Sequence, residues 1–277
     1  MGRCNHEEAD TRLVVHLLHA LRHFSLALVQ TGDTDVIVIL LCNFHHILAT
    51  NDAAQVWISF QAGTTKRMIN LNDLAETLGS IKCKALALFH AFTGSDSTSS
   101  FKFKGKRFCY KTLEKLPSVL DKFSTVTSSQ FQTSPSICEA AQDFVCTLYD
   151  SDGLSTTGQS SNNNVDLVRM DSFCRRTKDV ERISPTSDSL VLHLKRSVYQ
   201  SSIWASAFLE IIPEEDPEQY GWQVEDGKLV PIWMTLPLAK DVFHLEIKCS
   251  CTKQCANCKC IKNKLKCTRM CKCKCIQ

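Results

Sequence analysis

The chain has 277 residues, of which 44% are hydrophobic and 22% charged, an ordinary balance for one large or two modest globular domains. Its net charge of +3 hides an asymmetry, because residues 248–277 hold eight lysines, one arginine and no acid, which leaves residues 1–247 at −6. No apolar run approaches the roughly 18–20 residues of a membrane span, and MGRCNHEEAD is too polar for a secretory signal. We expect a soluble intracellular protein that makes no membrane contact.

Sixteen cysteines in a reducing compartment do not predict disulfides. Nine lie within residues 249–275 and are treated below. The others are scattered singly, as is typical of small buried hydrophobes. They are Cys4, Cys42, Cys83, Cys109, Cys138, Cys146 and Cys174.

Residues 7–23, EEADTRLVVHLLHALRH, have apolar residues at helical spacing and acids in the first turn, so they predict an amphipathic helix. His16, His19 and His23 share one face of it. A metal would need further ligands, and a solvated polar face explains the same pattern.

The stretch TGDTDVIVILL, residues 31–41, places Asp33 and Asp35 just before a buried apolar run. A strand over residues 26–30 would deliver both carboxylates to the carboxyl edge of an α/β sheet, where ligands bind. An acidic turn between two core elements is the alternative.

The pattern then predicts a strand within residues 53–63 and helices over 71–78, capped by Asn72, and over 82–92. Asp96 follows in the turn TGSDSTSS. Next, FKFKGKRF alternates basic and aromatic residues, which suits a nucleic-acid backbone or an exposed charged hairpin. Its basic residues are Lys102, Lys104, Lys106 and Arg107.

Beyond residue 120, we expect loops at 124–136 and 151–164 and helices at about 138–150 and 186–212. An acidic linker, PEEDPE, precedes a tryptophan-bearing segment. Trp204, Trp222 and Trp233 are predicted to anchor a core.

Three acidic groups thus stand along the first hundred residues: Glu8 with Asp10, Asp33 with Asp35, and Asp96. Each close pair of carboxylates costs about 4 kcal/mol at an effective dielectric near 20 unless a cation shares the site. Mg²⁺ or Mn²⁺ would take carboxylate oxygens, and two such ions could stabilise a phosphodiester displacement.

The order EEAD, TGDTDVIVIL, HAFTGSDST resembles the catalytic half of flap endonuclease and related 5′-nucleases of the PIN-like superfamily. The resemblance covers residues 6–120 and rests on three short motifs. It implies an α/β, parallel-sheet body in which Glu8, Asp10, Asp33, Asp35 and Asp96 bind metal. Asp10 stands where the family has glutamate, the family's N-terminal half has no counterpart here, and its glycine-rich hairpin is replaced by SSFKFKGK. A truncated product, a degenerate nuclease and a shorter PIN-like domain all fit.

The tail offers nine thiolates, whereas three tetrahedral zinc ions need twelve coordination positions, so three bridging thiolates would balance the count. Metal would supply the folding free energy that thirty residues cannot draw from a core. The ligands would be Cys249, Cys251, Cys255, Cys258, Cys260, Cys267, Cys271, Cys273 and Cys275.

The cysteine spacing resembles the CXC domain of the tesmin/TSO1 family, which implies DNA as partner and the nucleus as location. Basic residues between the cysteines would face outward toward phosphate. These are Lys253, Lys259, Lys262, Lys264, Lys266 and Arg269.

We therefore expect a PIN-like domain over residues 1–123, a mostly helical continuation over 124–240, and a zinc-binding tail over 248–277. The leading hypothesis is a divalent-metal-dependent nuclease, or a degenerate descendant, with no small-molecule substrate. The alternatives are a non-catalytic DNA-binding or chromatin-associated protein and a store for zinc or copper. The sequence predicts no oligomeric state.

Overall fold

The computed structural model describes residues 4–126, 134–150, 164–175 and 182–235, together with residues 249–252, 255, 257–262, 267, 271–273 and 275 of the tail. The chain divides into two compact units, one of residues 1–144 with 191–232 and one of residues 145–190 with 233–277. No helix among the described residues is long and apolar enough to cross a bilayer.

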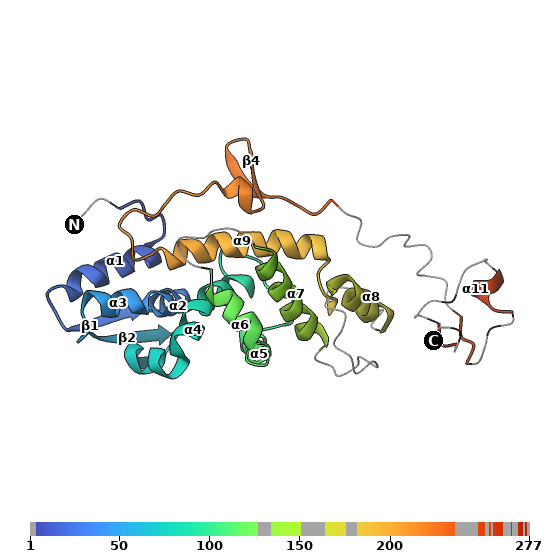
Figure 1. Ribbon diagram of the computed structural model, residues 1–277, viewed down its shortest axis with the longest axis horizontal. Coiled ribbons are helices and arrows are strands. Elements are labelled where there is room, and N and C mark those ends of the chain that lie inside the picture. The colour runs from blue at the N-terminus through green and yellow to red at the C-terminus, as the bar shows by residue number, and fades with distance from the viewer. Residues whose placement is uncertain are drawn as a thin grey trace. The chain divides into compact units, whose positions relative to one another are not determined.

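The class is mixed α/β, with a three-stranded sheet, a two-stranded sheet and many helices (Figure 1). Up to residue 124 the order is α1 (Ala9–Leu21), β1 (Leu26–Thr31), α2 (Thr34–Cys42), α3 (Phe44–Thr50), β2 (Gln55–Ala62), β3 (Thr65–Asn70), α4 (Leu71–Phe92), α5 (Lys106–Leu113) and α6 (Pro117–Ser124). There follow α7 (Pro135–Asp150), α8 (Val165–Arg175), α9 (Ser187–Ala205), η2 (Pro217–Tyr220), β4 (Trp222–Glu225), β5 (Lys228–Pro231) and α11 (Lys259–Lys262).

The three-stranded sheet has the order β1-β2-β3 and contains one parallel and one antiparallel pair of strands, and β4 and β5 form the two-stranded sheet. β1 runs parallel to β2, with Val29 opposite Ile58, whereas β2 and β3 are antiparallel. The predicted parallel sheet is therefore only partly present. Ala62 pairs with Thr65, which leaves a two-residue turn that Gly63 enters at φ +60°. So short a connection can join only antiparallel strands.

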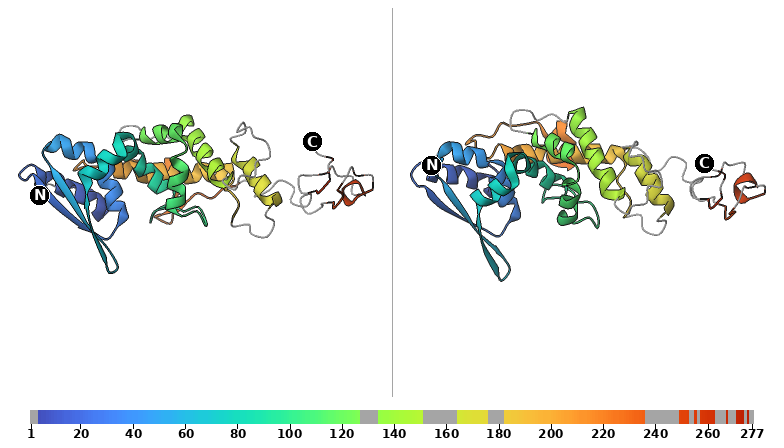
Figure 2. Two further views of the ribbon diagram at one scale, coloured as in Figure 1. Left: turned by 90° about the horizontal axis from the view of Figure 1, so that it is seen from below. Right: turned by 60° about the horizontal axis from the view of Figure 1, so that its bottom comes forward.

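The face of the sheet that carries Val29, Val56 and Ile58 packs against α1, α2 and α3 (Figure 2). α1 contributes Val14, Leu17 and the fully buried Leu21 to this core. The apolar run after Asp35 proves to be helix α2, whose residues Ile39 and Leu40 are completely buried. This packing fixes α1 and α2 beside the carboxyl end of β1.

The two helices predicted at 71–78 and 82–92 form one kinked helix, α4, with the break at Gly79 (φ +76°). Its cap is Asn70, which accepts from the backbone N–H groups of Asn72 and Asp73, and not Asn72 as predicted. The Asn72 side chain instead bonds the backbone of β2 at Ala54 and Val56. Helix α4 is thereby tied to the sheet.

A second, aromatic core surrounds Phe92 at the end of α4. Its ring contacts those of Phe101, Phe123 and Phe144 edge-on at 5.3–5.9 Å and stacks with His193 of α9 at 5.1 Å. Such aromatic contacts add stability beyond the area that they bury.

Helix α9 ends at Ala205, earlier than the predicted residue 212. The chain beyond it is held by N-terminal side chains: the His6 ring lies 2.6 Å from the Leu209 carbonyl oxygen, and Asn5 exchanges two 2.8 Å hydrogen bonds with the backbone of Ile212. These tertiary bonds replace the last helical turns.

Other expectations are corrected in detail. The basic segment 101–108 is no hairpin, because α5 begins at Lys106. The loop predicted at 124–136 overlaps the ends of α6 and α7, while residues 127–133 and 151–163 lie outside the described part of the chain. Among the tryptophans, Trp204 is buried and Trp222 half-buried, but Trp233 is 76% exposed and anchors no core.

Candidate functional site

The predicted acidic residues stand at the starts of two helices and in one turn. Glu8 is the N-cap residue of α1 and Asp10 lies in its first turn. Asp33 caps α2, and Asp35 lies in the first turn of that helix. Asp96 follows α4 in a turn closed by paired backbone bonds between Ser95 and Thr98.

The turn after β1 fixes the directions of Asp33 and Asp35. A side chain at Gly32 would place its Cβ 2.8 Å from the carbonyl oxygen of Gln61, so the backbone passes too close for any other residue. Asp33 then donates its N–H to the Thr31 hydroxyl at 2.9 Å and accepts from the Asp35 N–H at 2.8 Å. Asp33 is thus a helix cap as well as a member of the acidic group.

Glycine is equally required before Asp96. Gly94 has φ +113°, and a Cβ there would lie 2.6 Å from the Cβ of Ser100. The turn that presents Asp96 therefore depends on Gly94.

The acidic residues act on one another electrostatically. Burial, reinforced by repulsion from Asp33, Asp35 and Asp96, raises the pKa of Asp10. Burial also raises the pKa of Glu8, opposed by hydrogen bonds to α9 and assisted by repulsion from Asp10 and Asp35. Carboxylates far apart in sequence are therefore close enough to repel one another.

A buried histidine lies behind this group. Nε2 of His90 is 2.7 Å from Oδ1 of Asp35, and this bond, more than any other influence, lowers the pKa of Asp35. The ammonium of nearby Lys106 donates hydrogen bonds to the carbonyl oxygens of His90 and Gly94. Burial lowers the pKa of Lys106 to about 8, although the charge of Asp35 opposes this shift.

Side chains of helix α9 also form hydrogen bonds with the acidic residues and their turns. Gln200 Nε2 and Trp204 Nε1 each donate to the Glu8 carboxylate at 3.3 Å. Gln200 also accepts a 2.6 Å hydrogen bond from Ser97, the residue after Asp96. One side chain thus links the Asp96 turn to the first acidic residue.

Sequence reasoning missed these supporting residues. His90 could have been suspected, since it lies within the quoted motif HAFTGSDST and one turn inside an apolar helix. Gln200 and Trp204 are spaced to share a helix face, but no local pattern relates them to Glu8, which lies 192 and 196 residues earlier.

The carboxylates do not form a closed metal site. Among the described residues, the groups of three or more metal-binding side chains with ligand atoms within 4.8 Å of one another consist of cysteines alone. The same finding gives no support to a metal on His16, His19 and His23. An ion at the acidic group would have to draw its carboxylates together.

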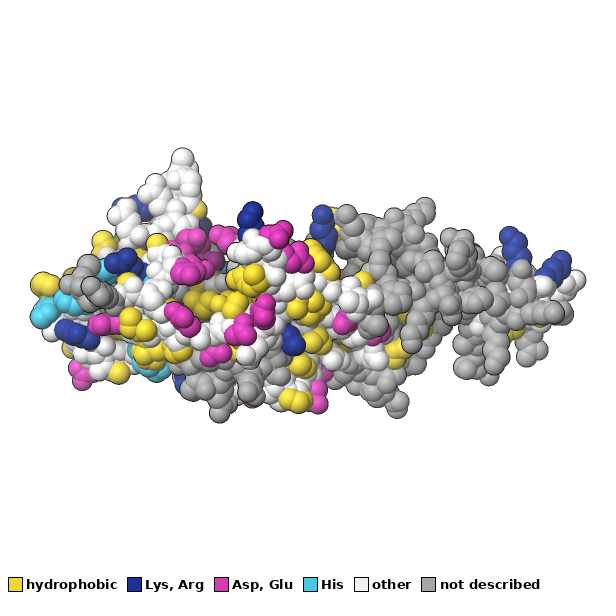
Figure 3. Space-filling model, turned by 90° about the horizontal axis from the view of Figure 1, so that it is seen from above, with side chains coloured by type: hydrophobic (Ala, Val, Ile, Leu, Met, Phe, Trp, Pro, Cys, Tyr) yellow, Lys and Arg dark blue, Asp and Glu magenta, His cyan; other side chains and the backbone are white. Residues whose placement is uncertain are grey.

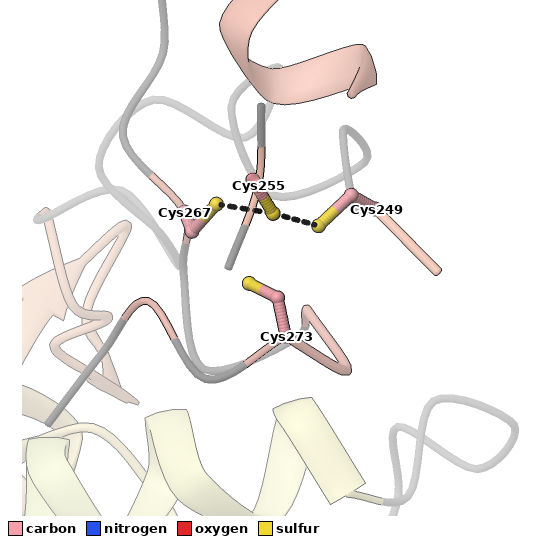
Figure 4. A group of neighbouring side chains, drawn as sticks. All are labelled: Cys249, Cys255, Cys267 and Cys273. Carbon is pink, nitrogen blue, oxygen red and sulfur yellow. Dashed lines mark hydrogen bonds between the residues drawn. The ribbon is translucent and has the colours of Figure 1, made fainter. Parts of the chain in front are cut away.

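The described tail cysteines form a cluster that could hold zinc (Figure 4). Cys255 lies between Cys249 and Cys267, with sulfur–sulfur distances of 3.4 and 3.7 Å. Tetrahedral zinc with bonds near 2.3 Å would separate its sulfurs by roughly 3.8 Å. The cluster therefore fits zinc and the CXC-like pattern.

In three overlapping groups of four cysteines, all the sulfurs lie within 4.8 Å of one another. They are Cys249, Cys255, Cys267 and Cys273; Cys249, Cys251, Cys255 and Cys258; and Cys249, Cys258, Cys260 and Cys267. The two remaining tail cysteines border them: the Cys271 sulfur lies 3.5 Å from that of Cys260, and the Cys275 sulfur accepts from the Cys255 N–H at 3.0 Å. All nine predicted ligands thus lie in or beside the cluster.

The thiols of the cluster differ in pKa: burial raises the pKa of Cys249, Cys255 and Cys260, whereas hydrogen bonds lower that of two others. A backbone hydrogen bond from Ile261 lowers the pKa of Cys258 to about 7, and one from Cys275 lowers that of Cys273 to about 6. Because thiolates bind metal, these positions favour it near neutral pH.

The predicted nucleic-acid residues have varied settings. Arg107, Lys259 and Lys262 are exposed. The ammonium groups of Lys102 and Lys104 lie 5.5 and 4.8 Å from the ring centroids of Phe103 and Phe108. The Lys106 ammonium instead donates a hydrogen bond to the carbonyl oxygen of His90. Lys253, Lys264, Lys266 and Arg269 lie outside the described residues.

No family model, curated protein or solved structure matches this chain. The resemblances to PIN-like nucleases and to the CXC domain therefore rest on the motifs themselves.

Proposed function

We propose that this chain is a DNA-associated metalloprotein that hydrolyses phosphodiesters at the acidic group and binds DNA through a zinc-cluster tail. The observation that carries the proposal is the electrostatic convergence of Asp10 with Asp33, Asp35 and Asp96 from three separate segments. Such clustering is unfavourable for a protein alone and favourable when cations share it.

The donors suit Mg²⁺ or Mn²⁺, which prefer carboxylate oxygens. Asp33, Asp35 and Asp96 would hold one ion, and Glu8 and Asp10 would bridge to a second. When bound, such ions supply charge stabilisation for the attacking and leaving oxygens of a phosphodiester. His90 fixes one oxygen of Asp35, the Asp35 N–H fixes one oxygen of Asp33, and α9 fixes Glu8. The protein therefore orients three of the five carboxylates in advance.

In the tail, the three overlapping groups support a cluster of three zinc ions. Cys249 belongs to all three groups. Each group also contains two of Cys255, Cys258 and Cys267, and each of these three thiols belongs to two groups. They would be the three bridging thiolates that nine ligands and twelve positions require. The remaining positions would fall to Cys249 with Cys251, Cys260 with Cys271, and Cys273 with Cys275.

The tail also supplies positive charge. Lys259 and Lys262 stand exposed on α11 between cluster cysteines. A rigid cluster would present them to DNA phosphates without an acidic residue nearby in sequence. The nucleus is the location that this proposal favours.

A second candidate is a DNA-binding protein without hydrolytic activity. It is favoured because Asp35 and Glu8 already have protein partners and the described carboxylates do not close around a metal position. The body would then serve as a scaffold for the tail.

Hydrolysis of single-stranded and flapped DNA in Mn²⁺ tests the proposal, with Asp33→Asn and Asp96→Asn as variants. Asparagine caps a helix about as well as aspartate, so Asp33→Asn should remove charge with little loss of stability. Asp52→Asn, on an exposed turn residue, is the matched control. We expect activity in the parent chain and the control and at least a 100-fold loss, on the order of that for other electrostatic contacts at active sites, in both variants.

An inactive parent chain that still binds DNA would favour the second candidate. Activity that survives both substitutions would show that hydrolysis occurs elsewhere or comes from a contaminant.

A further inference from the structure

The outer side of α1 borders a small basic hollow, which we call the α1 hollow. Its basic lining residues are Arg12, His16 and His19 of the helix and Arg22 just after it. The rest of the lining is Cys4, Val15, Leu18, Phe208 and Glu210. Its volume is about 50 Å³. Because one water needs about 10–15 Å³ of such space, the hollow holds a few waters or one phosphate-sized group.

Helical spacing brings the two arginines and the two histidines together. Arg12, His16 and His19 recur at intervals of four and three residues, and Arg22 follows one turn later. The opposite side of the helix carries Val14, Leu17 and Leu21 into the core. The hollow therefore lies between the exposed side of a helix whose other side is packed and the segment after α9.

The two guanidiniums are not held in ion pairs within the described part of the chain. Neither Arg12 nor Arg22 forms an ion pair or a side-chain hydrogen bond with another described residue. Glu210 is the one carboxylate among the lining residues, and it lies beyond ion-pair distance of both. Two permanent positive charges thus face one negative charge, with two imidazoles beside them.

We propose that the α1 hollow binds a phosphate group of a nucleic-acid backbone. This inference rests on the proposed function, since α1 also carries Glu8 and Asp10 at its N-terminus. Arginine is the side chain best suited to phosphate, because its planar fork can donate two hydrogen bonds to two oxygens. Figure 3 shows Lys or Arg and His side chains gathered at its left, where α1 lies.

The neighbouring aromatic residue favours contact with the backbone over contact with a base. Phe208 stacks on His46, with ring centroids 3.5 Å apart and 14° between the planes. One face of the phenyl ring is therefore occupied. His19 and His23, with rings 5.7 Å apart, extend the polar strip along the helix.

Fluorescence anisotropy of labelled oligothymidylate over a range of NaCl concentrations tests the proposal on the zinc-loaded full chain, without Mg²⁺ or Mn²⁺. The variant is Arg12→Gln with Arg22→Gln. The control is Lys66→Gln with Arg67→Gln, which removes the same charge from exposed positions on β3. Each phosphate contact contributes about 0.7 to the slope of log affinity against log salt for a single strand. We expect the variant to lose about 0.7–1.4 of that slope and the control to lose much less.

Equal slopes for the variant and the control would overturn the inference. Inorganic phosphate separates the two sources of a phosphate group: a thermal shift by phosphate that the variant loses, with DNA binding unchanged, would identify a small-anion site and also overturn it. Because binding is measured without hydrolysis, a chain that binds through the hollow but cleaves no DNA refutes the proposed nuclease function alone.

Discussion

His90 and Asp35 form a buried pair, with Nε2 and Oδ1 2.7 Å apart, although they stand 55 residues apart in the chain. The His90 ring also lies 5.8 Å from that of Trp204, which donates to Glu8. A continuous set of side chains thus connects the first and second acidic motifs through α4 and α9. His90 and Trp204 thus orient acidic residues without being proposed ligands themselves.

Replacing His90 should weaken divalent-metal binding without removing a proposed ligand. Loss of an orienting partner typically costs about 10–100-fold in metal affinity. We expect His90→Gln to raise the Mn²⁺ concentration for half-maximal hydrolysis by about 10-fold, with a smaller effect on the rate at saturating metal. His23→Gln, at an exposed position, is the control. An unchanged Mn²⁺ requirement in His90→Gln would show that His90 does not orient Asp35 for metal.

Trp204 serves packing and hydrogen bonding together, and two substitutions separate these roles. Its side chain is 2% exposed. Trp204→Phe keeps most of the packing but removes the donor to Glu8, so it should lower the free energy of unfolding by about 1–2 kcal/mol. Trp204→Ala should cost about 3–5 kcal/mol through the cavity that it leaves. Urea unfolding measures both, and exposed Trp233→Phe should stay within about 0.5 kcal/mol of the parent. Equal losses for the two Trp204 variants would assign the whole effect to the hydrogen bond.

Some of this arrangement could be read from the sequence. The periodicity of α1, the strand β1 and the positions of Asp33, Asp35 and Asp96 were predictable because each is a local pattern. The apolar run after Asp35 could not be assigned, since a buried helix and a buried strand look alike over six residues. The end of α9 and the partners of Glu8 depend on contacts about 200 residues apart, through Asn5, His6 and Gln200, which no local pattern encodes.

His193 should make stability depend on pH. It is buried against Phe92 and donates from Nε2 to that residue's carbonyl oxygen, and burial lowers its pKa to about 4. In the unfolded chain its pKa returns to about 6.5. Below that value only the unfolded state gains the proton, so stability falls as the pH drops from about 6.5 toward 4.

The expected loss from this group is about 2 kcal/mol between pH 6.5 and about 5. His193→Gln keeps a donor for the Phe92 carbonyl but cannot titrate, so its free energy of unfolding should fall by that much less over the same interval. Urea unfolding at the two pH values measures the difference, with His23→Gln as the control. Parallel pH dependence in the parent and His193→Gln would mean that His193 is protonated in the folded state or that the site opens to water.

Cysteines shared between two groups should matter more for metal content than cysteines in one. Cys258 belongs to two groups and Cys251 to one. If the bridging assignment is correct, Cys258→Ser weakens the binding of two zinc ions, whereas Cys251→Ser weakens that of one. Zinc per chain, measured by mass spectrometry after dialysis, should therefore fall from about three to about one in the first variant and to about two in the second. Cys4→Ser, in the body of the protein, should leave the zinc content unchanged.

Chelation adds a second readout. Metal supplies the folding free energy of so small a cluster, so stripping zinc should unfold the tail and abolish its DNA binding, while the circular dichroism of the helices in the body persists. Identical zinc losses in Cys258→Ser and Cys251→Ser would contradict the shared-thiolate arrangement, because a cluster without bridges would lose one ion in either case.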